Sequence, residues 1–161
     1  MGYLDLTKNT IFEKKQPNYL TLSLRILANI IWHIPFLGFI NAFFSFLIGS
    51  LLVLTVIGAP IGLGLIELSK FLMTPFTSVM VDKKNLDQGQ NKIWLAFGFI
   101  VRILYFPFGL ALSIVTIVQI VGLTFSIVGI PLAIILAKCL STYFNPVNKK
   151  AVSRLMLTKR N

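Results

Sequence analysis

The chain has 161 residues, of which 56% are hydrophobic and only 12% are charged, and its mean hydropathy is +0.84. This composition leaves too little polar surface to cover a water-soluble globule, so it excludes an ordinary soluble domain and indicates an integral membrane protein. The formal charge of +10 would suggest nucleic acid in a soluble protein. Here the basic residues flank apolar runs, so we expect anionic lipid headgroups as partners and no nucleic acid.

Residues 1–19 are predicted to form a polar cytoplasmic tail. No small-residue cleavage site follows, so we expect no removable signal peptide. Basic residues gather before the first apolar block, between the two blocks and after the second. The positive-inside rule then places all three segments, including both termini, in the cytoplasm. The residues concerned are Lys8, Lys14, Lys15 and Arg25, then Lys83, Lys84 and Lys92, then Lys149, Lys150, Arg154, Lys159 and Arg160.

The chain contains an internal repeat. Shifting the sequence by 71 positions superposes four glycines and prolines of one half on four of the other, which is the signature of a duplicated unit. We predict repeat one at 20–84, a polar cytoplasmic linker at 85–91, repeat two at 92–150 and a basic cytoplasmic tail at 151–161. The matching pairs are Gly38 and Gly109, Gly58 and Gly129, Pro60 and Pro131, and Pro75 and Pro146.

Each unit begins with a segment that suits the membrane interface. In residues 20–34, Arg25, Asn29 and His33 recur at helical spacing on one side, and leucines and isoleucines occupy the other. This pattern predicts an amphipathic interfacial helix. Trp32 and Trp94 fit an aromatic belt at the membrane surface.

The second segments, 36–57 and 108–128, are each long enough for one crossing of about 30 Å. A Gly-x-Pro follows in each copy, formed by Gly58 and Pro60 and by Gly129 and Pro131. Glycine can end a helix in the left-handed conformation and proline fits the first turn of the next, so we predict tight helical reversals at these hinges.

The third segments, 61–74 and 132–145, are shorter and carry charges. Glu67 and Lys70 share one helical face, and Lys138 occupies the position of Glu67 in the second copy. Several interpretations of these charges remain open. Glu67 can pair with Lys70 on its own helix or with Lys138 of the other repeat. The charges can also snorkel to a headgroup or line an ion or proton path. About 14 residues fall short of the hydrocarbon core, so these arms either cross fully or re-enter.

The second segments also carry weak polar faces, which favour close helix packing, with the lining of a pore as the alternative. Their candidate residues are Asn41 and Ser45 in the first copy and Thr116, Gln119 and Ser126 in the second.

The stretches IELSKFLMTPF at 66–76 and VGIPLAIILAKCLSTYFNP at 128–146 resemble the YccF-type bacterial inner-membrane component domain. The resemblance covers most of residues 20–150 and implies tandem copies and an inner-membrane location. It does not imply a mechanism.

The sequence therefore predicts an all-α, multi-pass inner-membrane protein. It would have two tandem helical hairpins with Gly-x-Pro hinges, about four membrane-embedded segments and interfacial amphipathic helices. His33 is the sole histidine and no acid pair, phosphate loop or nucleophile motif accompanies it, so we expect no enzyme, no cofactor and no metal. Four thin segments cannot surround a pathway alone, so we expect a homo-oligomer. Its function is read as an oligomeric channel or transport component, or as a non-conducting scaffold whose charges pair the repeats.

Overall fold

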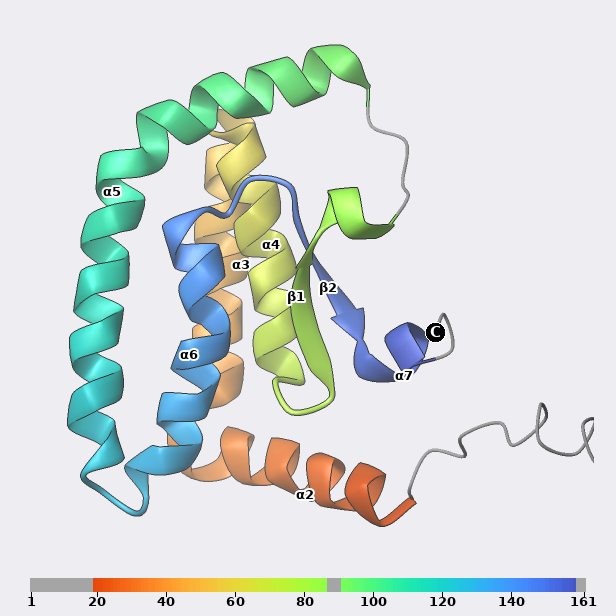
Figure 1. The fold of residues 1–161 in the computed structure, drawn as a ribbon, viewed down its shortest axis with the longest axis vertical. Coiled ribbons are helices and arrows are strands. Elements are labelled where there is room, and N and C mark those ends of the chain that lie inside the picture. Colours follow the sequence, from red (N-terminus) through yellow and green to blue (C-terminus); the bar gives the residue numbers. More distant parts are fainter. Residues whose placement is uncertain (1–18, 87–90, 159–161) are drawn as a thin grey trace, which may run out of the picture.

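The computed structural model of the protein describes residues 19–86 and 91–158 (Figure 1). Its elements follow the chain as two successive groups, each made of long helices followed by one short strand. The helices are α2 (Tyr19–Phe36), α3 (Gly38–Leu54), α4 (Ala59–Met73), η1 (Lys83–Leu86), α5 (Lys92–Thr124), α6 (Gly129–Phe144) and α7 (Arg154–Thr158), and the strands are β1 (Ser78–Asp82) and β2 (Lys149–Ser153).

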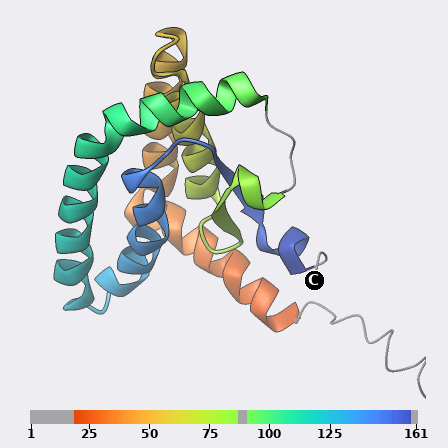
Figure 2. The ribbon, with the colours of Figure 1, turned by 45° about the horizontal axis from the view of Figure 1, so that its top comes forward.

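The fold contains the two expected helical hairpins. Helix α3 packs on α4, and α5 packs on α6. Gly49 and Gly62 let the first pair approach closely, because a Cβ on Gly49 would lie 2.8 Å from the carbonyl oxygen of Gly62. The turn between α3 and α4 and the turn between α5 and α6 lie at opposite ends of the molecule in both views (Figures 1 and 2).

Both Gly-x-Pro hinges are turns between helices, but neither Gly58 nor Gly129 takes the expected left-handed conformation. Gly58 has a right-handed conformation with φ of −77°, and Val56 takes the left-handed one with φ of 60°. Glycine is needed at 58 for space, because a Cβ there would lie 2.7 Å from Thr55 Oγ1. Pro60 stands in the first turn of α4, where its missing N–H costs nothing.

The second group differs from the expected interfacial helix followed by a separate membrane segment. Helix α5 runs unbroken through 33 residues with Pro107 inside it, and Figure 1 shows it bending near its middle. A proline removes one helical hydrogen bond and kinks a long helix without ending it. In the first group the chain breaks instead, since Leu37 is left-handed with φ of 49° and α2 and α3 meet at 77°.

The described residues are mostly helical, as the all-α prediction expects, but a two-stranded antiparallel sheet that was not predicted joins the two groups. Strand β1 pairs with β2 in a register that runs from Ser78 opposite Ser153 to Asp82 opposite Lys149. Strand β2 also crosses the predicted boundary at residue 150, so its last three residues belong to the fold and not to a tail.

The register of the sheet has a local two-fold pattern. Its central pair, Met80 and Ala151, lies 71 positions apart, which is the offset that superposes the glycines and prolines. The same offset relates two backbone hydrogen bonds beside the sheet. Lys83 N donates to Asn148 O at 2.9 Å, and Arg154 N donates to Thr77 O at 3.0 Å.

Most of the apolar surface lies outside the core. The core gathers around Phe71, Leu68, Ile135 and Cys139, all nearly inaccessible. Among the described residues, α5 is long and apolar enough to cross a membrane, and α2 with α3 passes the same criterion as one bent span. Only 17% of the apolar window in α5 is buried. The core helix of a soluble protein would be mostly buried, so this surface suits lipid or a partner helix.

Candidate functional site

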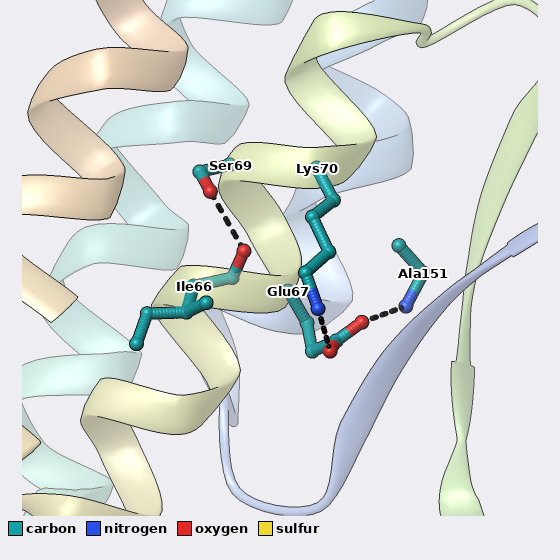
Figure 3. A network of polar contacts seen from close by, with 5 residues as sticks. All are labelled: Ile66, Glu67, Ser69, Lys70 and Ala151. Atoms are coloured by element: carbon teal, nitrogen blue, oxygen red, sulfur yellow. Dashed lines mark hydrogen bonds and ion pairs between the residues drawn. The ribbon is translucent and has the colours of Figure 1, made fainter. Parts of the chain in front are cut away.

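Glu67 links the first hairpin to the second strand. Its Oε1 accepts a hydrogen bond from Lys70 Nζ at 2.6 Å, and its Oε2 accepts one from the backbone N–H of Ala151 at 2.9 Å (Figure 3). Lys70 is exposed, whereas the Glu67 side chain is 15% exposed. Glu67 thus satisfies an N–H of strand β2, at the edge of a sheet that has only two strands.

Lys138 makes the corresponding link in the opposite direction. From α6 its Nζ donates to the carbonyl oxygen of Pro75 at 2.8 Å and lies 5.1 Å from the centre of the Phe76 ring. Pro75 is fully buried. A carbonyl that no neighbouring N–H satisfies is costly to bury, so the lysine stabilises the turn that follows α4.

The predicted ion pair between Glu67 and Lys138 does not form, because Glu67 pairs with Lys70 and Lys138 Nζ donates to the carbonyl oxygen of Pro75. The two side chains start from aligned positions and each reaches the other half of the chain. They end on different backbone groups, however, because the carboxylate accepts from an N–H and the ammonium donates to a carbonyl.

The polar face of α2 points into the protein, and its apolar face points out. Asn29 Oδ1 accepts from Phe76 N at 3.0 Å, and its Nδ2 donates to Thr77 Oγ1 at 3.2 Å. His33 Nε2 lies 2.8 Å from Met73 O. The sequence pattern identified this face correctly but assigned it to the membrane surface. It organises the turn between α4 and β1 instead.

One tryptophan of the expected aromatic belt is buried. Trp32 is 3% exposed and donates from Nε1 to Leu72 O at 2.9 Å. Tyr105 does the same in the second group, from its hydroxyl to Tyr143 O at 3.1 Å. The two acceptors are 71 positions apart and lie in the last turns of α4 and α6, so each of these helices ends beside an aromatic donor. Sequence reasoning missed these contacts, because the two donors are 73 positions apart and do not follow the offset of 71 that relates their acceptors.

The polar helix faces do not act as one surface. Thr116 is buried and bonds within its own helix to Leu112 O at 2.7 Å. Ser45 is half-buried, whereas Asn41, Gln119 and Ser126 are exposed. The exposed members therefore face the outside of a single chain, and packing within the chain uses Thr116.

No metal or covalent chemistry emerges from the described residues. They contain no group of three His, Cys, Asp or Glu side chains placed to hold a metal ion. Cys139 is buried beside Phe71 and Ile135 in the core cluster. The contacts that Glu67 and Lys138 make to the other half are hydrogen bonds to the backbone.

Comparison with known protein families gives a match in the first group of elements. The family model of the YccF inner membrane component domain matches residues 27–78. No curated protein and no solved structure matches the chain. The matched segment runs from α2 to the first residue of β1 and includes Glu67, Lys70, Pro75 and the first hinge. Residues 27–78 thus match the YccF inner membrane component domain, and this match supports an inner-membrane location for the protein.

Proposed function

We propose that the protein is a non-conducting, homo-oligomeric scaffold of the inner membrane whose charged side chains hold its two halves together. The observation that carries this proposal is the pair of reciprocal links described above. Glu67 binds the backbone of the second half at Ala151, and Lys138 binds that of the first half at Pro75. These hydrogen bonds give both charged side chains a structural role that requires no ion path.

The two halves are, in this proposal, copies of one unit related by a two-fold axis through the sheet. The offset of 71 recurs in the glycines and prolines, in the central pair Met80 and Ala151, and in the acceptors Leu72 and Tyr143. An offset that governs both sequence and pairing supports duplication.

The proposed axis lies along the membrane normal. That orientation puts equivalent segments on one side, as the positive-inside rule requires for both termini and the linker. It also explains the hairpin turns, which are apolar and exposed at opposite ends of the molecule: Val56 is 71% exposed, and Phe125 and Ile127 are each 88% exposed. Both turns then lie in lipid as re-entrant structures.

Ion flux through liposomes tests the proposed function. The wild-type protein is expected to leave the bilayer silent at every voltage, and Lys138→Glu is expected to lower stability without creating selectivity. A steady conductance whose anion-to-cation preference changes in Lys138→Glu would contradict the scaffold and support a channel. Lys70→Glu is the control at an exposed position.

An oligomeric channel is the second candidate, and one observation favours it. Asn41 and Gln119 are exposed on α3 and α5, among side chains that otherwise suit lipid. Polar groups facing hydrocarbon are costly, so a second copy would cover them by packing or around water. In a channel, Asn41→Leu and Gln119→Leu would change conductance. In a scaffold they would change only the oligomer.

A further inference from the structure

Three basic residues come from three elements to the turn at 75–77. Lys138, on α6, donates to Pro75 O, and the backbone of Arg154, at the start of α7, donates to Thr77 O. Arg25 lies one helical turn before Asn29, which holds both Phe76 and Thr77. The charges of Arg25 and Arg154 both act on Lys138. We call Arg25, Lys138 and Arg154 the basic cluster.

The positive charge of Lys138 is not neutralised by its contacts. A carbonyl oxygen and an aromatic ring are both uncharged, and an ammonium has three N–H donors, of which the Pro75 carbonyl uses one. The two carboxylates of the described residues, Glu67 and Asp82, pair with Lys70 and Lys149 instead. The like charges of Arg25 and Lys138 repel each other, so a bound anion would stabilise this pair.

An apolar pocket of about 200 Å³ opens beside the basic cluster, between α2 and α6. Phe76 belongs to both sites, since its ring lines the pocket and also contacts Lys138. On α6 the pocket residues Ile134 and Ile135 lie one turn before Lys138, and on α2 Ala28 lies one turn after Arg25. Ile31, Trp32 and Pro131 complete the lining, all of which is apolar or aromatic.

We propose that this pocket and the basic cluster form one binding site for an anionic phospholipid, with an acyl chain in the pocket and the phosphate against Arg25 and Lys138. An apolar cavity that ends in cations is complementary to a molecule with an apolar chain and an anionic head. The inner membrane surrounds the protein with such molecules, and charge-assisted hydrogen bonds from Arg and Lys are the strong contacts to a phosphate.

The residue at the position of Lys138 distinguishes this site from the equivalent place in the other half. The short motif around Arg25 recurs around Arg102, which is exposed, while the position of Lys138 is taken by Glu67 in the first half. A carboxylate at that position would repel a phosphate. We therefore infer one such lipid site per chain, and Arg102 provides a matched control.

Trp32 supplies the readout, because it lines the pocket and an acyl chain carrying bromine quenches a tryptophan that it touches. The protein with Trp94→Phe would be placed in phosphatidylcholine vesicles containing a small fraction of brominated phosphatidylglycerol or brominated phosphatidylcholine. We expect the anionic lipid to quench Trp32 at a lower mole fraction. Arg25→Gln should reduce this preference about fivefold, the effect of roughly one near-surface cation, whereas Arg102→Gln should not change it.

Two further variants separate the parts of the site. Lys138→Arg should retain the preference, and Lys138→Gln should weaken it. Ala28→Phe, which fills the pocket, should protect Trp32 from both brominated lipids while helical content measured by circular dichroism stays constant. Equal quenching by the two lipids in the wild-type protein, or a preference unchanged by Arg25→Gln, would overturn the proposal.

Inorganic phosphate distinguishes a lipid from a free anion. Added at constant ionic strength, it should leave quenching by phosphatidylglycerol unchanged, because it lacks the acyl chain. Displacement of the brominated lipid by millimolar phosphate would show an anion site without a chain site and would contradict the proposal.

Discussion

Lys138 Nζ donates a hydrogen bond to the carbonyl oxygen of Pro75 at 2.8 Å, across 63 positions of the chain. A lysine at the middle of a membrane helix costs about 2.5–3.5 kcal/mol on the insertion scale. Here the charge serves a buried proline turn that lies in the other half of the molecule. The polar residue in the apolar helix is therefore explained by long-range structure.

Replacing Lys138 with methionine tests this link. The substitution retains an unbranched side chain but leaves the Pro75 carbonyl unsatisfied, so we expect a loss of about 1–3 kcal/mol in the free energy of unfolding. Unfolding in detergent measures it. Lys70→Met is the control, because an exposed ion pair contributes about 1 kcal/mol or less. Equal losses of unfolding free energy in the two variants would show that the Pro75 contact contributes no more than the exposed ion pair.

Two substitutions of Glu67 test its hydrogen bond to Ala151, because only one of them keeps an oxygen that can accept this bond. Glu67→Gln retains an oxygen for the N–H of Ala151 and should cost less than about 1 kcal/mol, whereas Glu67→Leu leaves that N–H unpaired and should cost about 1–3 kcal/mol. Because Glu67 and Lys138 do not touch, Glu67→Leu and Lys138→Met should add to within about 0.5 kcal/mol. A coupling energy well above that value would show that Glu67 and Lys138 interact directly.

Gly64 and Gly122 are predicted to respond oppositely to alanine. A Cβ at Gly64 would overlap the Pro146 carbonyl and lie 2.9 Å from Pro146 Cβ, while one at Gly122 meets nothing within 4 Å. Gly64→Ala should destabilise by about 1–3 kcal/mol through overpacking. Gly122→Ala should be neutral or stabilise by up to about 1 kcal/mol through helix propensity. Thermal unfolding of both variants checks the sign, and a stabilised Gly64→Ala would refute the close contact.

The sequence predicted the hairpins because their signals are local. Apolar length, Gly58 with Pro60, and Gly129 with Pro131 each act on neighbouring residues, and the observed helices start close to these positions. The shared face of Glu67 and Lys70 was also predicted, since it follows from helical spacing alone. The ion pair between them is confirmed.

The sheet could not be predicted in the same way. Each strand has five residues and no hairpin turn, and its partner lies on average 71 positions away, so no local alternation signals the pairing. The direction of the α2 polar face was missed for a related reason. Asn29 and Trp32 are aimed at the turn after α4, which only the packed structure places beside them.

Membrane sidedness tests the central claim that a two-fold axis along the membrane normal relates the halves. Single cysteines would replace Leu20, Lys84 and Met156 in a Cys139→Ala background, with Val56 and Ile127 as positions in the hairpin turns. We predict that an impermeant thiol reagent labels the first three from the cytoplasmic side and labels the two turns from neither side. Labelling of Lys84→Cys from the side opposite to Leu20→Cys would place the axis in the membrane plane and contradict the account.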